Sequence, residues 1–375
     1  MDKSREAADA ISFISFSGVG SNVRRGQSSG NIRSCAGTEA LRGGALVPSI
    51  AFPLCWQAAF GTGFAIAFVA SLIHGALIES ARERRVHPTH LIKQTTLGAP
   101  VETSGIGLHT AVPVHVRLLP APPDTGYVFV RTDLSGFEIP ASVEWVAHCS
   151  YATTLMRTGV MLSTVEHLLA ALRGAGVDNA YIEVDNLEVP IMDGSAEAFT
   201  EMIERAGVVE QPLARRALLV RERVAVEQGN RSITVEPAGV YEIDCMIDFP
   251  HPLIGVQRFR VALTNGAFGR EIASARTFGF TAEIEALRRA NLIRGGTLDN
   301  AIVLTPEGML NETSLRFADE FVRHKILDIV GDLALLGMPI LGRVKAERSG
   351  HILHATLMTK LLRNRAAWEI GEMKQ

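Results

Sequence analysis

A histidine and an aspartate four residues apart are the first residues in this sequence whose spacing points to chemistry. His324 and Asp328 lie in FVRHKILDIVGD (321–332), where apolar residues recur with helical spacing. Residues at i and i+4 share one face of a helix, so this imidazole and carboxylate can reach the same metal ion. Lys325 and Asp332 add two charges to the otherwise apolar segment. Because this spacing is common, a buried His–Asp ion pair with Lys325 extending to solvent is the alternative.

Three other stretches carry side chains that can complete a hydrolytic site. Glu166 and His167 stand side by side in STVEHLL, at the start of a predicted helix. His351 follows a turn glycine in SGH and is predicted to lie in a loop. The stretch ARTFGF (275–280) offers a hydroxyl at Thr277, a guanidinium and two aromatic rings. Each also has a simpler interpretation: a helix-capping acid, a core or solvated histidine, and a packed turn.

Taken together, these side chains fit a zinc amide hydrolase. Two histidines and one aspartate are a three-ligand set that leaves the fourth position of Zn²⁺ for water. Zinc lowers the pKa of that water to about 7, and a nearby carboxylate can then take its proton. A protonated histidine can serve as general acid to the leaving amine, and a hydroxyl can help to stabilise the oxyanion. The sequence contains each part and leaves open whether the parts meet in space.

The elements that must position these residues alternate between strands and helices from about residue 91 onward. This texture predicts an α+β fold in two halves, 91–210 and 217–375, with a linker at 207–216 that contains Pro212. The predicted strands are Val112–Leu118, Tyr127–Arg131, Tyr181–Val184, Leu218–Val226, Ser232–Val235, Tyr241–Ile247 and Ala301–Leu304. The predicted helices are Ser163–Leu172, Ala198–Ala206, Ala282–Ala290, Asp319–Leu336 and Leu353–Trp368. Ser163 and Glu166 are expected to form a capping box at the start of the first helix.

Composition excludes several classes of protein. The 375 residues carry a net charge of −3, so no general affinity for nucleic acid is expected. The four cysteines are scattered without a CxxC pair, which disfavours both a disulfide framework and a thiolate zinc site. A reducing compartment, the cytoplasm, is therefore expected. Any metal would need histidine and carboxylate ligands.

The first ninety residues differ from the rest. Residues 1–44 are rich in Ser, Gly, Arg and Ala and predict a disordered tail. Residues 56–78 have the length and apolarity of a membrane span, and arginines on both sides leave its orientation unassigned. Three interpretations stay open. The segment is a membrane anchor that holds the protein at the inner face of the cytoplasmic membrane, a buried or interfacial helix, or an extension absent from the mature protein.

Over roughly residues 90–370 the sequence resembles the zinc-dependent UDP-3-O-acyl-N-acetylglucosamine deacetylases of lipid A biosynthesis. The stretches that carry the resemblance are SGIGLHT (104–110), STVEHLLAAL (163–172), DNAYIEV with VPIMDGSA (178–196), SARTFGF (274–280), FVRHKILDIVGDL (321–333) and SGH (349–351). The resemblance implies two α+β domains of similar topology, each a β-sheet packed on helices, with the active site between them. The first ninety residues have no counterpart in the family pattern.

The resemblance also implies a role for each candidate residue. The zinc ligands would be His167, His324 and Asp328. Glu166 would be the general base. His351 would be the general acid or electrostatic stabiliser, oriented by Asp332. Thr277 would supply the hydroxyl that helps to hold the oxyanion. Lys325 would lie near the diphosphate, Phe249 would stack on the uracil, and Phe278 would contact the sugar. The acyl chain would be contacted by Ile284, Leu298 and Val303.

By resemblance, the chain is expected to remove the N-acetyl group from UDP-3-O-(3-hydroxyacyl)-N-acetylglucosamine with Zn²⁺ as cofactor. Two alternatives stay open: a zinc amidohydrolase for another N-acetylated sugar nucleotide, and a non-catalytic UDP-sugar-lipid binding protein. Fe²⁺ also suits such ligands. Two positions depart from or vary within the family pattern: Glu283 stands where Asp is familiar, and Tyr151 stands at a variable position near the zinc.

Overall fold

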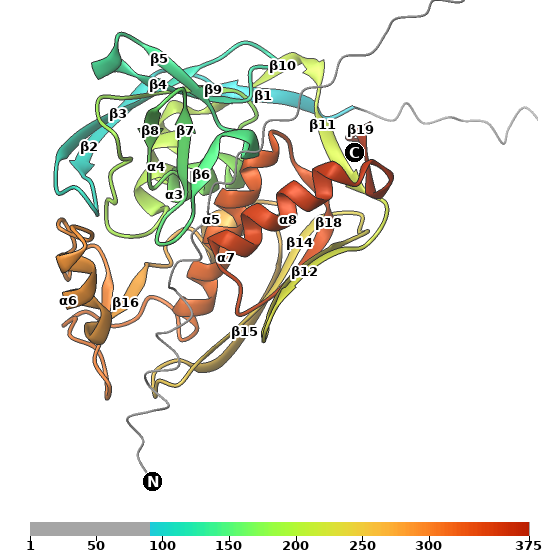
Figure 1. The fold of residues 1–375 in the computed structure, drawn as a ribbon. Helices are drawn as coiled ribbons and strands as arrows, with labels where there is room; N and C mark the ends of the chain where they lie inside the picture. The colour runs from blue at the N-terminus through green and yellow to red at the C-terminus, as the bar shows by residue number, and fades with distance from the viewer. Residues whose placement is uncertain (1–90, 375) are drawn as a thin grey trace, which may run out of the picture. The chain divides into compact units, whose positions relative to one another are not determined.

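The computed structural model describes residues 91–374, which form the expected α+β fold. Two larger β-sheets each pack against helices, and helices from the two halves of the chain meet in the middle (Figure 1). Within residues 91–374, no helix combines the length and the apolarity needed to cross a bilayer. The segment 56–78, for which a membrane span is one interpretation, lies outside the described residues.

The first large sheet has five strands in the order β2-β3-β9-β4-β5. Its pairings are antiparallel except for β4 with β9, which is parallel. Side chains alternate between buried and exposed along β3, so one face of the sheet meets the helices and the other meets solvent. The strands and their two helices are β2 (Val101–Ile106), β3 (Pro113–Pro120), β4 (Tyr127–Arg131), β5 (Phe137–Pro140), β9 (Ala180–Val184), α3 (Glu166–Gly174) and α4 (Glu197–Ala206).

The second large sheet has seven strands and is organised around β18 (Ile340–Glu347). This strand pairs with β11 and β14 in parallel and with β13 in antiparallel orientation. Helices α7 and α8 contact strands of this sheet. The remaining elements are β11 (Arg216–Val220), β12 (Val224–Gln228), β13 (Arg231–Glu236), β14 (Tyr241–Phe249), β15 (Gly255–Ala262), β19 (Trp368–Glu372), α7 (Glu320–Leu333) and α8 (His351–Arg363).

Three small sheets and two short helices complete the described fold. The segment predicted as a linker at 207–216 is instead largely a strand, β10, which pairs antiparallel with β1. Pro212 is compatible with this strand because the strand has only one neighbour. The role of the segment as a linker between two domains stays a prediction. The elements are β1 (Lys93–Leu97), β10 (Val208–Ala214), β6 (Val146–His148), β7 (Thr154–Arg157), β8 (Val160–Leu162), β16 (Phe278–Phe280), β17 (Ile302–Leu304), α5 (Ala267–Glu271) and α6 (Thr281–Arg289).

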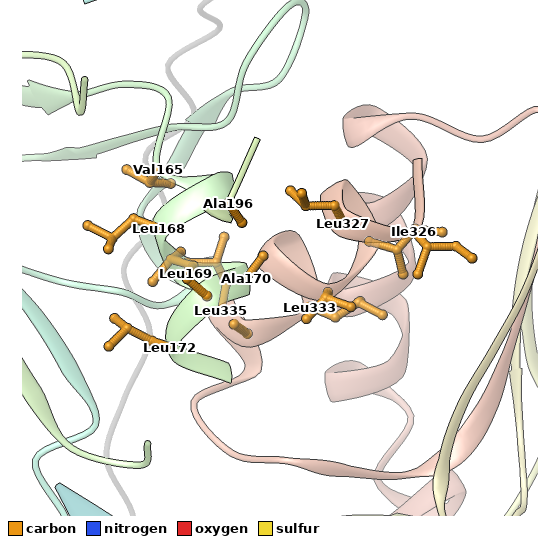
Figure 2. Packing of buried hydrophobic residues seen from close by; sticks show 14 of the residues in the cluster. Val165, Leu168, Leu169, Ala170, Leu172, Ala196, Ile326, Leu327, Leu333 and Leu335 are labelled. Carbon is orange, nitrogen blue, oxygen red and sulfur yellow. The ribbon is translucent and has the colours of Figure 1, made fainter. Parts of the chain in front are cut away.

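The contact between α3 and α7 lies at the centre of the core. Figure 2 shows Leu169 and Ala170 of α3 on the side of that helix that faces α7, while Leu168 lies on the opposite side. The approach is close because Gly331 of α7 has no side chain: a Cβ there would lie 2.0 Å from the carbonyl oxygen of Glu166. A buried apolar contact of this kind fixes the spacing of the polar groups that the two helices carry.

The start of α3 corrects the predicted capping box. The helix begins at Glu166 after Val165, and no side chain caps it. The hydroxyl of Ser163 instead bonds that of Thr154 at 2.9 Å, and the carboxylate of Glu166 accepts a hydrogen bond from the Thr153 amide at 3.1 Å. The spacing of a capping box is therefore present without its geometry, which leaves the Glu166 carboxylate free for another role.

Other element boundaries also differ from the prediction. The strand expected at 218–226 divides into β11 and β12, and the last helix runs over 351–363 before the chain turns into β19. His351 is the first residue of α8 rather than a loop residue, with Gly350 as its N-cap. The long helix expected at 319–336 is confirmed as α7 followed by one 3₁₀ turn at 334–336.

Candidate active site

The three predicted metal ligands meet in the core. His167 comes from the first turn of α3, while His324 and Asp328 come from one face of α7. Ligand atoms of all three lie within 4.8 Å of one another, and each side chain is at least nine-tenths buried. The Nε2 atoms of His167 and His324 lie 3.8 and 3.4 Å from Oδ1 of Asp328. Two nitrogens and one oxygen therefore converge on one point.

The protonation of these residues suits metal binding. His324 donates its Nδ1–H to the carbonyl oxygen of Ala275 at 3.0 Å, which leaves a lone pair on Nε2. Burial, with a further contribution from His324, lowers the pKa of His167 to about 3, so this imidazole is neutral at pH 7. Burial opposes ionisation of Asp328, but Lys325 and the histidines outweigh it and hold the pKa of this carboxyl below its usual range.

Each oxygen of Asp328 has its own environment. Oδ1 faces the two histidines, whereas Oδ2 accepts a hydrogen bond from Nζ of Lys325 at 2.8 Å. The Lys325 ammonium also lies 5.5 Å from the centre of the Phe278 ring. The predicted contact of Lys325 with phosphate stays a prediction, and what the structure shows is a cation that keeps Asp328 ionised beside a cavity.

A cavity of about 280 Å³ opens onto the metal-ligand cluster. Its lining includes the three ligands together with Glu166, Thr277, Phe278, Lys325 and His351. Residues of α3 line it beside residues of α7 and α8, so both halves of the chain contribute. The cavity is also lined by four residues with no predicted role in the chemistry: Leu108, Tyr151, Gln228 and Arg231.

Glu166 and His351 face each other across this cavity, with Oε1 4.0 Å from Nε2. Burial raises the pKa of Glu166 to about 8, although the neighbouring His351 opposes this shift. Burial lowers the pKa of His351, but the carboxylate of Asp332 outweighs it and raises the value to about 10. Both pKa values are therefore raised, and strongly perturbed pKa values in one cavity are typical of a functional site.

Asp332 holds His351 in place from the next turn of α7. Its Oδ2 accepts the Nδ1–H of His351 at 2.7 Å, which directs Nε2 of that ring towards Glu166. The same oxygen accepts a bond from Nδ1 of His354 at 2.6 Å, and Oδ1 accepts one from the hydroxyl of Thr153 at 2.6 Å. The predicted contact between His351 and Asp332 is therefore present, and their catalytic roles stay predictions.

A buried ion pair anchors the segment that carries Thr277. The carboxylate of Glu320, with no exposed surface, accepts hydrogen bonds from the backbone amide and the guanidinium of Arg276. This pair ties residues 275–277 to the start of α7. The carbonyl of Ala275 thereby reaches His324, and Thr277 is placed at the cavity wall.

Comparisons with known proteins identify the family of the chain. The family model for LpxC, UDP-3-O-acyl N-acetylglycosamine deacetylase, matches residues 94–363. The chain belongs to this family. A UDP-3-O-acyl-N-acetylglucosamine deacetylase of Solibacter usitatus is 48% identical over 277 residues, which are 74% of this chain and 94% of the relative.

Two further relatives carry the same name. The deacetylase of Myxococcus xanthus is 47% identical over 278 residues, 74% of this chain and 88% of its own length. The deacetylase of Coxiella burnetii (strain CbuK_Q154) is 44% identical over 287 residues, which are 76% of this chain and 95% of the relative. The protein is therefore an amidohydrolase of the LpxC family, which acts in lipid A biosynthesis.

Not all predicted site residues of this LpxC family member line the same cavity. Phe249 is half-buried and packs against Phe278, with ring centres 5.7 Å apart. Leu298 is 46% exposed, and Ile284 and Val303 are half-buried in α6 and β17. None of these four is among the lining residues of the 280 Å³ cavity. Their contacts to the uracil and the acyl chain stay predictions.

Sequence reasoning missed two residues that bind Asp332 in this LpxC family member. His354 follows His351 by three residues and so shares its helix face, a signal that the sequence HILH contains. Thr153 is separated from Asp332 by 179 positions, and a single threonine beside a short strand carries no pattern that would single it out. Only the folded structure brings this pair together.

Proposed function

We propose that this protein catalyses the zinc-dependent removal of the N-acetyl group from UDP-3-O-(3-hydroxyacyl)-N-acetylglucosamine. The observation that carries the proposal is one cavity onto which a metal-ligand cluster and an acid–base pair both open. The substrate follows from the names of the relatives, which extend over three quarters of the chain. The expected two-histidine, one-carboxylate site is the kind that Zn²⁺ occupies in hydrolases.

The residues present fit a divalent metal ion. His167, His324 and Asp328 offer two neutral nitrogens and an ionised oxygen, and His324 is already held in the tautomer that leaves Nε2 free. When bound, zinc acts as a Lewis acid that makes water more acidic and polarises an amide oxygen. Iron(II) suits the same ligand set, so the metal is identified by the metal content and activity of the purified protein.

Glu166 acts as the general base in this proposal, and His351 as the general acid. The ionised Glu166 carboxylate takes a proton from the water that attacks the acetyl carbon. The protonated Nε2 of His351 gives a proton to the amine as the carbon–nitrogen bond breaks. Asp332 keeps His351 protonated and aimed at the cavity.

The remaining roles are proposed for residues at the cavity wall and beyond it. The Thr277 hydroxyl stabilises the oxyanion, Lys325 binds the diphosphate, and Phe278 contacts the sugar. Phe249 would stack on the uracil, and the wall of the acyl passage would be formed by Ile284, Leu298 and Val303. Two α+β domains, each built on one of the large sheets, would enclose the substrate between them.

The decisive experiment measures acetate release by the purified full-length chain. Metal-loaded protein should release acetate from the acylated UDP-sugar, a chelator should abolish this, and added Zn²⁺ should restore it. UDP-N-acetylglucosamine without the acyl chain is the comparison substrate. Equal turnover of that compound, or none of the acylated one, would sink the proposed substrate. Fractionation of cells expressing the full chain tests whether residues 56–78 tether a cytoplasmic enzyme to the membrane.

A further inference from the structure

The carboxylate of Asp332 binds three hydrogen-bond donors, although only one of them belongs to the proposed chemistry. Thr153 occupies Oδ1, while His351 and His354 share Oδ2. The distances are 2.6, 2.7 and 2.6 Å. Asp332, Thr153 and His354 are each at most 2% exposed, so water does not compete for these bonds.

The three donors come from two separate places in the fold. Thr153 lies immediately before β7, and both histidines lie in the first turn of α8. Asp332 is on α7, and its carboxylate could rotate about the Cβ–Cγ bond if His351 were its only partner. Thr153 bonds Oδ1 and His354 bonds Oδ2, and the two bonds together fix the plane of the carboxylate. The direction of the His351 ring then follows from that plane.

His354 is itself held in place. Its Nε2 lies 3.0 Å from the hydroxyl of Ser349, while its Nδ1–H points to Asp332. Thr153 has a second connection as well, because its backbone amide donates to Oε2 of Glu166 at 3.1 Å. One residue therefore touches both carboxylates that flank His351.

We propose that Thr153 and His354 are positioning residues that grip Asp332 from both sides and so aim His351 at the leaving amine. The inference rests on the proposed function, because it assumes that His351 is the acid. Neither residue touches substrate or metal in this scheme. Loss of either hydrogen bond to Asp332 should lower kcat without weakening substrate binding, because a misdirected acid affects the step in which the amine leaves.

A buried carboxylate needs partners for stability alone, so the test must separate positioning from folding. Thr153→Val keeps the shape and the backbone amide to Glu166 but removes the hydroxyl, whereas Thr153→Ser retains it. His354→Leu removes the donor, whereas His354→Asn places an amide nitrogen where Nδ1 was. Thr154→Val is the matched control, because it removes the hydroxyl of a neighbouring buried threonine, whose bond to Ser163 does not reach Asp332.

The expected result is a fall in kcat of about 10- to 100-fold for Thr153→Val and His354→Leu, the size of one hydrogen bond to a charged group. KM and bound metal should stay near the wild-type values, and the melting temperature should fall by no more than about 2–5 °C, the size expected for the loss of one buried hydrogen bond. Thr153→Ser and His354→Asn should recover most of the activity, and Thr154→Val should keep it. Each variant is also combined with His351→Ala.

The combined variants decide the matter. If Thr153 and His354 act through His351, their substitution should change the residual activity of His351→Ala by less than about twofold. A further 10-fold loss in that background would overturn the inference and leave a structural role only. So would wild-type kcat in both Thr153→Val and His354→Leu. If His351→Ala alone keeps full activity, the proposed acid is wrong, and that is a separate failure. Should one of the two residues not tolerate substitution, the other pair of variants gives the same test.

Discussion

At the scale of single residues, burial and charge set the pKa values of the proposed base, Glu166, and the proposed acid, His351. Burial raises the pKa of Glu166 to about 8. The same burial would strip His351 of its proton, but Asp332 prevents this and raises the pKa of His351 to about 10. Burial thus decides the pKa of Glu166, whereas charge decides that of His351, because only His351 has an opposite charge within hydrogen-bond distance.

These shifts predict a bell-shaped dependence of kcat/KM on pH. A base must be deprotonated, so kcat/KM should fall as the pH drops through the pKa of Glu166. A bound cation lowers that pKa below about 8, which places the acidic limb below pH 8. An acid must be protonated, so kcat/KM should fall again as the pH rises through the pKa of His351, which the same cation lowers below about 10.

The alkaline limb assigns the acid. His351→Gln cannot hold a proton and should therefore lack this limb, while its activity at neutral pH is already reduced by about 100-fold or more. The measurement is kcat/KM against pH for both proteins at constant ionic strength. An alkaline limb that persists unchanged in His351→Gln would assign it to another group.

Glu166→Gln tests the base with little change of shape. The amide cannot accept a proton from water, so kcat should fall by about 100- to 10,000-fold. Because Glu166 is not one of the three metal ligands, bound metal should remain stoichiometric, as measured by elemental analysis. A Glu166→Gln protein with near wild-type turnover would show that the proton goes elsewhere.

At the scale of elements, the sequence predicted best where a segment has one periodicity and one environment. Helix α7 has apolar residues at helical spacing, so the shared face of His324 and Asp328 was predictable. Strand β18 was not predicted, although it is central, because two of its buried positions are the small residues Gly342 and Ala346, which weaken the alternation with Arg343 and Lys345. Both charged residues pair with the carboxylate of Glu236 on the neighbouring strand, a compensation visible only after folding.

The capping box shows why local spacing can mislead. Ser163 and Glu166 have the right separation, but the tertiary structure gives the serine a partner in Thr154 and the glutamate one in Thr153. The companions of Asp332 were hidden for a related reason. Long-range hydrogen bonds leave no periodic trace in a single sequence.

The contact of α3 with α7 predicts the effect of one added methyl group. Gly331→Ala gains about 1 kcal/mol of helix propensity but places a Cβ against the Glu166 backbone, and overpacking costs about 1–3 kcal/mol. The 2.0 Å approach is to backbone, which cannot swing away, so we expect a net loss of about 1–2 kcal/mol and a lower metal content. Denaturant unfolding and elemental analysis measure the two effects.

Gly269→Ala in α5 is the matched control for this substitution. It gains the same helix propensity, and its Cβ would meet nothing within 4 Å. Its free energy of unfolding should therefore equal or exceed that of the wild type. A Gly331→Ala protein as stable as Gly269→Ala would show that the two helices can separate without loss.

At the scale of the whole molecule, metal binding should stabilise the fold, because the ligands meet only in the native state. Zn²⁺ at 100 times its dissociation constant adds about 2.7 kcal/mol, which corresponds to about 4–5 °C in melting temperature for a unit of this size. His167→Ala should lose this shift, whereas His115→Ala, an exposed histidine outside the cluster, should keep it. Thermal melts with and without zinc give the answer, and an undiminished shift in His167→Ala would exclude that ligand.

The division of the ligands between α3 and α7 also has a consequence for the order of events during synthesis. His167 leaves the ribosome long before His324 and Asp328, so the early nascent chain presents one imidazole and no pocket for a cation. Metal capture must then be a late step that follows the docking of the two helices. Zinc uptake during refolding should therefore lag behind the recovery of the helical circular-dichroism signal. A chain that has bound zinc is one in which α3 and α7 have already docked.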